Sequence, residues 1–241
     1  FIVITIYAWT GVQKFRVTYF TEIIPTLISS YTSSPSIATV SLFYATPFIE
    51  LTLAIGLLFH LTRRLSVLGL VTLHAGILIM VSPLGRDENY SIIPWNVTMA
   101  CVTTLLFWRS KTTLRAIMFP ALTRARIVFL QLCVILPALG YFGLWNPYLS
   151  FSVYSGASAH GYAFFQERAI TTLPPAMRSA LSPPEEGLYQ LPFDRWGVAT
   201  LFSLPSPQPQ DVHGMGNHLC RTIPNAESDL MVIIRTPAKA W

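Results

Sequence analysis

Two ionisable side chains stand inside apolar stretches of the sequence. Glu50 lies in FYATPFIELTLAIGLLF and His74 lies in LGLVTLHAGILIM. A charged group within hydrocarbon is costly, so such a residue is protonated, paired, or turned toward a polar cavity. Because both lie near the middle of consecutive apolar runs, we expect Glu50 and His74 to hydrogen-bond, relay protons, or contact a quinone head group. The alternative is that they only tie neighbouring helices together.

Further polar residues stand at the ends of apolar runs. Gln13 and Lys14 end the first run in TGVQKF, and Trp95 and Asn96 begin a later run in PWN. Together with Glu50 they could line an outward-facing polar pocket. A lysine that reaches toward the membrane surface and a tryptophan at the interface explain the same residues without a pocket.

Soft metal-binding side chains gather in one segment near the C-terminus, DVHGMGNHLC: His213, Met215, His218 and Cys220. Their spacing matches no zinc or haem signature. If the segment is a helix, a stripe of apolar residues becomes its buried face. That stripe comprises Val212, Met215, Leu219 and Ile223. We therefore expect no metal site, and no catalytic residue beyond the candidates Glu50 and His74.

The composition indicates which kind of helices must position these side chains. Of the 241 residues, 52% are hydrophobic and 11% are charged, against about 25% charged in soluble domains. Spanning the hydrocarbon takes roughly 20 apolar residues. Suitable runs occur at 39–60, 65–82, 92–108 and 127–146, and the shorter run at 1–12 resembles the end of a truncated first span. The expected fold is an all-α transmembrane helix bundle of about five spans, residues 1–146.

Basic residues orient this bundle. Arg63 and Arg64 in one link, and five basic residues within 109–126, have no acidic residue beside them. By the positive-inside rule these two links face the cytoplasm. Apolar positions at helical spacing also predict an amphipathic helix near 112–124 on that face. The positions of the basic residues are therefore explained by the orientation of the helices in the lipid bilayer. We expect no nucleic-acid partner.

The remaining residues, 147–241, form a separate extramembrane unit in this interpretation. They contain eleven of the eighteen prolines. The pattern predicts strands at 162–166 and 230–235, a short helix at 174–181, and a helix at 194–204 capped by Asp194. We expect a small α+β domain on the non-cytoplasmic side, which is the periplasmic side of a bacterial inner membrane.

Several short motifs in the first half resemble the DoxX-like superfamily, which includes the MauE-like membrane proteins. They are GVQKF with Gly11 and Lys14, EIIP at 22–25, PFIELTLAIGLL with Glu50, and TRRLSVLGL, within residues 8–108. The resemblance implies a four-helix membrane bundle linked to quinone-dependent oxidoreductases or to maturation of periplasmic enzymes. This chain differs in its fifth span, its C-terminal domain and its lack of paired outer cysteines.

We therefore expect a non-catalytic integral membrane subunit or accessory protein of a larger complex, linked to electron transfer or enzyme maturation. Its partners would be other membrane-protein subunits, with no assigned cofactor beyond contact with a quinone or lipid. One alternative is a membrane enzyme that acts on a quinone or lipid through Glu50 and His74. A second alternative is a proton-coupled transporter.

The topology yields the first testable prediction. Single cysteines placed at residues 64 and 190, in a background without the native cysteines, should react with a membrane-impermeant reagent from opposite sides of sealed vesicles. The excess of basic residues in the two links is the physical reason. Labelling of both positions from the same side would contradict this orientation.

Overall fold

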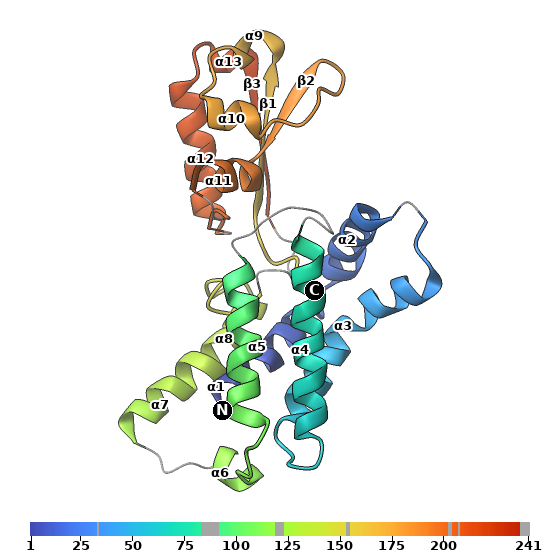
Figure 1. Ribbon diagram of the computed structural model, residues 1–241. Coiled ribbons are helices and arrows are strands. Elements are labelled where there is room, and N and C mark those ends of the chain that lie inside the picture. Colours follow the sequence, from blue (N-terminus) through green and yellow to red (C-terminus); the bar gives the residue numbers. More distant parts are fainter. Residues whose placement is uncertain are drawn as a thin grey trace. The chain divides into compact units, whose positions relative to one another are not determined.

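The computed structural model describes residues 1–32, 34–82, 92–118, 123–152, 155–201, 204–206 and 208–236. The chain divides into two compact units, Phe1–Ala157 and Ser158–Pro237 (Figure 1). The first unit is helical, and the second contains a small three-stranded sheet.

The first unit contains helices at all five predicted positions. Its elements are α1 (Ile2–Gln13), η1 (Tyr19–Ile23), α2 (Ile24–Tyr31), α3 (Ile37–Gly56), α4 (Arg63–Val81), α5 (Ile93–Phe107), α6 (Leu114–Met118), α7 (Arg124–Leu130), η3 (Gln131–Ile135) and α8 (Leu136–Tyr141). Among the described residues, α3 and α4 are long and apolar enough to cross a membrane. Helices α1, α5 and Ile127–Tyr141 are shorter apolar helices. The structure thus supports two candidate spans and not a complete bundle of five.

Helix α1 packs closely against α3 at Gly11. A Cβ atom added to Gly11 would lie 3.1 Å from the Pro47 carbonyl oxygen and 3.2 Å from the Leu51 amide nitrogen. These are main-chain atoms, so a larger side chain at this position would push the two helices apart. The absence of a side chain therefore allows the backbones to approach, as small residues do between membrane helices.

Among the described residues, two π-helical turns interrupt the shorter helices, and each precedes a proline. The turn η1 is followed by Pro25 at the second position of α2, and η3 is followed by Pro137 at the second position of α8. Proline has no amide hydrogen and its ring clashes with the carbonyl four residues earlier. A locally widened turn accommodates that clash. The predicted span at 127–146 is consequently a composite of α7, η3 and α8 that ends at Tyr141.

The predicted amphipathic helix near 112–124 is shorter in the structure. Helix α6 covers Leu114–Met118, while residues 119–122 lie outside the described residues and Arg124 begins α7. Ile117 is buried in the core of the first unit, whereas Leu114 is 40% exposed. The short helix therefore inserts the side chain of Ile117 into the bundle.

The segment that follows α8 belongs to the first unit, although the predicted domain limit was residue 146. The Thr18 hydroxyl donates to the Gly156 carbonyl oxygen at 3.3 Å. A Cβ atom on Gly140 would meet the Ser150 side chain, because the two residues are in close contact. Residues 147–152 and 155–157 thus fold back onto the helices, and the change between compact units comes at Ser158.

The second unit packs helices on one face of an antiparallel sheet. Its elements are β1 (His160–Gln166), α9 (Glu167–Ile170), α10 (Pro175–Ser179), β2 (Leu188–Pro192), α11 (Phe193–Leu201), α12 (Pro209–Thr222), α13 (Ala226–Asp229) and β3 (Leu230–Arg235), with strand order β2-β1-β3. Ala163 and Phe165 of β1 are fully buried against the core. Met231 and Ile233 of β3 are 49% and 41% exposed, because alternate side chains of a strand face opposite sides.

Most sequence predictions for this unit are confirmed, with two corrections. The strands at 162–166 and 230–235 and the short helix near 174–181 are present. Helix α11 begins at Phe193, so Asp194 lies in its first turn and is not its capping residue; its carboxylate instead lies 3.2 Å from His160 Nδ1. Strand β2 was not predicted from the sequence.

The predicted buried stripe of α12 is confirmed. Val212, Leu219 and Ile223 are at most 7% exposed, and Met215 packs against the same core. His213 and His218 lie off this stripe and are exposed. The apolar spacing, and not the donor side chains, therefore decides which face of α12 is buried.

A buried carboxylate at the end of α13, directly before β3, gives a pH prediction. The Ser228 hydroxyl donates to Asp229 at 2.6 Å and Arg168 forms an ion pair with it, and these contacts lower the pKa of the Asp229 carboxyl. The stabilisation is complete above about pH 4, the unfolded value, and is lost as the pH falls through the lower folded value. We expect wild type to unfold at higher temperature than Asp229→Asn at pH 7, with the gap narrowing toward pH 3.

The matched control for this comparison is Asp211→Asn, because Asp211 is an exposed carboxylate on α12. Its unfolding temperature should differ less from wild type at pH 7. A gap between wild type and Asp229→Asn that stays constant down to pH 3 would contradict the proposed ionic contribution.

Candidate functional site

Two long polar side chains lie on one face of α1, Tyr7 within the helix and Lys14 at its C-cap. Tyr7 and Lys14 are separated by seven residues, close to two helical turns. Tyr7 is 4% exposed, and the Lys14 side chain is 13% exposed. Each reaches a polar group on another helix, so α1 supplies partners to the buried residues of the bundle.

Lys14 forms a buried ion pair with Glu50 of α3. Its ammonium nitrogen lies 2.5 Å from both carboxylate oxygens. The Glu50 side chain is 7% exposed. A carboxylate in an apolar environment is stabilised in its charged form by an opposite charge at this distance. The lysine therefore supplies the counter-charge that Glu50 requires.

His74 of α4 stands at the centre of a second network. Its Nδ1 lies 2.8 Å from the Asn96 side-chain oxygen, and its Nε2 lies 2.8 Å from the Tyr7 hydroxyl. The Asn96 amide nitrogen donates to the Ile92 carbonyl at 2.8 Å, which directs the amide oxygen to the ring. Because an amide oxygen only accepts, Nδ1 carries the hydrogen, and in the neutral ring Nε2 accepts from Tyr7. The neutral ring of His74 is thus held as one tautomer.

The Tyr7 hydroxyl extends this network to α5. It lies 2.9 Å from the Thr103 hydroxyl, and Thr103 is fully buried. Since Tyr7 donates to His74, Thr103 is the donor to Tyr7. The network therefore joins α1, α4 and α5 through side chains alone.

The prediction that Glu50 and His74 hydrogen-bond to each other is wrong, because each residue bonds to other partners. Lys14 occupies both oxygens of Glu50, and Tyr7 and Asn96 occupy the ring nitrogens of His74. The contacts to both residues come from one stretch of the chain, through Tyr7 to His74 and through Lys14 to Glu50. The two residues therefore share one polar region in which α1 provides the direct contacts.

The four residues of the predicted polar pocket belong to different parts of the structure. Lys14 joins the ion pair and Asn96 joins the histidine network. Trp95 is 52% exposed and Gln13 is fully buried. The four side chains consequently do not converge on one pocket.

Gln13 belongs instead to a third polar contact, at the end of α8. It donates to the Pro137 carbonyl oxygen at 2.8 Å. Arg16 donates to the Gln13 side-chain oxygen at 3.1 Å and to the carbonyl oxygens of Gly140 and Tyr141 at 3.0 and 2.9 Å. A buried guanidinium thus ties the end of α1 to the end of α8.

Sequence reasoning missed Tyr7, Thr103 and Arg16. A tyrosine or threonine within an apolar run is compatible with lipid contact, so its type alone shows no polar partner. The one available signal was the spacing of Tyr7 and Lys14, which places both on the same face of a helix.

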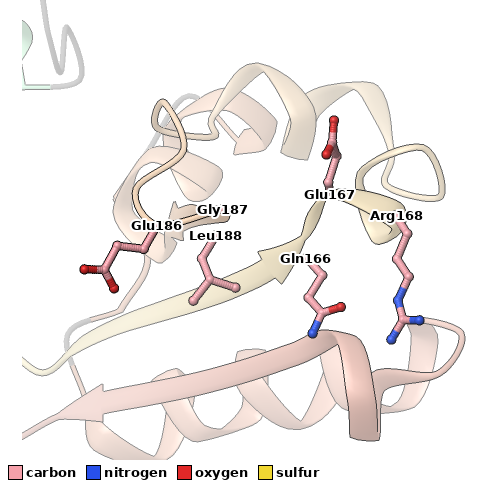
Figure 2. A pocket seen from close by; sticks show the side chains of 6 residues that line it. All are labelled: Gln166, Glu167, Arg168, Glu186, Gly187 and Leu188. Atoms are coloured by element: carbon pink, nitrogen blue, oxygen red, sulfur yellow. The ribbon is translucent and has the colours of Figure 1, made fainter.

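A shallow hollow in the second unit is a separate candidate. It is lined by Gln166, Glu167, Arg168, Glu186, Gly187 and Leu188 (Figure 2). In Figure 2 the carboxylates of Glu167 and Glu186 point away from each other. Arg168 pairs with Asp229. The charged groups do not converge, so this hollow lacks the arrangement expected of a catalytic site.

No cluster that could hold a metal ion was found among the described residues. His213 Nδ1 lies 2.7 Å from the Pro209 carbonyl, and the ring of His218 stacks on Trp196 with centroids 6.5 Å apart. These two histidines therefore have local partners within the second unit.

Comparisons with protein families, with curated proteins and with solved structures found no match to this chain. The functional argument therefore depends on the geometry of the polar networks.

The ion pair predicts a non-additive response to mutation. Removing one member of a buried pair leaves an uncompensated charge, whereas replacing both with apolar residues is often neutral. We expect Lys14→Met or Glu50→Leu alone to lower the free energy of unfolding in detergent by about 1–3 kcal/mol, toward the smaller values found in membranes. The double variant should return to within about 1 kcal/mol of wild type.

Glu50→Gln is the matched control, because it keeps the side-chain shape and removes the charge. Its stability should fall below wild type, since it leaves Lys14 without a counter-charge. A double variant whose loss equals the sum of the two single losses would show that the two side chains are not energetically coupled.

Proposed function

We propose that this chain is a non-catalytic integral membrane subunit or accessory protein of a larger membrane complex. The proposal places it in a bacterial inner membrane, with the second unit on the non-cytoplasmic side. The apolar composition and the two long helices α3 and α4 support the membrane location. The link to electron transfer or enzyme maturation follows from the DoxX-like resemblance of residues 8–108.

One observation carries the non-catalytic role: the hydrogen-bonding atoms of the candidate residues are already engaged. Both oxygens of Glu50 face Lys14, and both ring nitrogens of His74 have partners. A general base needs an available lone pair within reach of the substrate proton. Groups satisfied by one another instead act as ties between helices.

The outer surface of the long helices fits this role. Leu42 and Phe48 of α3 are 60% and 58% exposed, and Leu68 and Ile79 of α4 are 51% and 57% exposed. Apolar side chains of this kind are suited to lipid or to the helices of other subunits. The polar interior and the apolar exterior together support a scaffold that assembles with membrane partners.

One observation favours a membrane enzyme that acts on a quinone or lipid as a second candidate. The hydrogen bonds from Thr103 through Tyr7 to His74 form a continuous chain of exchangeable protons. Such a chain could deliver a proton to a substrate if His74 gave up its contact with Asn96.

Purification of the tagged full chain in mild detergent tests the proposal. We expect it to co-purify in fixed ratio with larger subunits, and the double variant Lys14→Met, Glu50→Leu should still assemble and support the activity of the complex. That variant keeps the packing but cannot transfer a proton at residue 50.

The enzyme alternative predicts the opposite pattern. The isolated chain would modify a quinone or lipid, and both Glu50→Gln and the double variant would abolish turnover without loss of folding. That result would overturn the accessory role.

A further inference from the structure

We propose that the end of the first unit formed by the α3–α4 link and the segment after α5 is a binding surface for anionic phospholipid headgroups. We call it the basic end and define it by the exposed side chains of Arg64, Arg109, Lys111 and Arg115. The inference rests on the membrane location proposed above and is independent of the accessory role.

Arg63 holds the two links of the basic end side by side. Its side chain is almost fully buried, at 1% exposure. It donates to the Leu57 and Leu58 carbonyls of the first link at 2.8 and 3.1 Å, and to those of Ser110 and Thr112 in the second at 2.9 Å each. Two segments far apart in the sequence are thereby fixed as one surface, and the positive charge of Arg63 has no carboxylate beside it.

The four exposed basic residues have no acidic neighbours in the sequence. No Asp or Glu occurs between Glu50 and Asp87, or between Glu88 and Glu167. The ion pairs among the described residues involve none of the four. Their charges are therefore available to an external anion.

Apolar side chains accompany these charges. Leu61 and Leu65 beside Arg64 are 84% and 73% exposed, and Trp108 beside Arg109 is 37% exposed. A soluble acidic partner would leave such side chains in water. Cations interleaved with exposed leucine and tryptophan match the boundary between lipid headgroups and acyl chains. Anionic headgroups therefore account for both features.

Lipid binding to the delipidated full chain tests the proposal. The protein in a neutral detergent is titrated with dioleoylphosphatidylglycerol or dioleoylphosphatidylcholine, and bound lipid is counted by native mass spectrometry. Wild type should bind the anionic lipid more tightly. The variant R64Q/R109Q/R115Q should reduce that preference by about fivefold per arginine at low salt.

The matched control is R178Q/R195Q/R221Q, which removes the same charge from exposed arginines of the second unit. It should keep the preference for the anionic lipid. Wild type without any preference, or an equal loss in both triple variants, would overturn the proposal. Binding of poly-glutamate without a preference for the anionic lipid would assign the surface to an acidic protein instead.

If the variant R64Q/R109Q/R115Q fails to fold, a salt titration of wild type tests the proposal instead. The preference should shrink as sodium chloride rises from about 0.05 to 0.5 M, because salt screens exposed charges. A preference that does not change with salt would overturn the proposal. Failure of the chain to fractionate with membranes would refute the membrane location itself, whereas absence of partner subunits would refute only the accessory role.

Discussion

The ion pair between Lys14 and Glu50 is the interaction on which the arrangement of the first unit depends. A carboxylate among apolar helices requires a counter-charge, and only close approach of α1 brings one within reach. Gly11 permits that approach because no side chain separates its backbone from α3. Once α1 is held there, Tyr7, two turns away from Lys14, meets His74. One helix face thus provides a hydrogen-bond partner for both Glu50 and His74.

Arg63 and Arg16 are buried, and each binds main-chain carbonyl oxygens near helix ends. Arg63 and Arg16 donate mainly to main-chain carbonyls that helix ends and links leave without partners. Irregular backbone is expensive away from water, and the planar guanidinium offers several donors in fixed directions. Arg63 thereby joins two links, and Arg16 joins α1 to α8. Among the described residues, the exposed arginines near Arg63 make no such internal contacts, which is why they suit an external anion.

Local sequence explains much of the fold. Apolar runs predicted helices at all five positions, and a short run rich in β-branched residues predicted the strand Leu230–Arg235. The stripe on α12 followed from the spacing of Val212 and Leu219. Prolines modify this pattern of helices. Pro25 and Pro137 each follow a π-helical turn, so the helix is not regular at these positions. Strand β2 escaped prediction because its apolar alternation is short and ends in a proline.

The sequence by itself indicated that Glu50 and His74 are buried, and roughly how far along their helices they lie, because composition and rise per residue are local properties. Only the tertiary structure decided their partners. Glu50 meets Lys14 and His74 meets Tyr7, since the rotation of each helix about its axis depends on the packing of its neighbours. The close contact of α1 with α3 at Gly11, and not the sequence positions of Glu50 and His74, sets which polar atoms come within bonding distance.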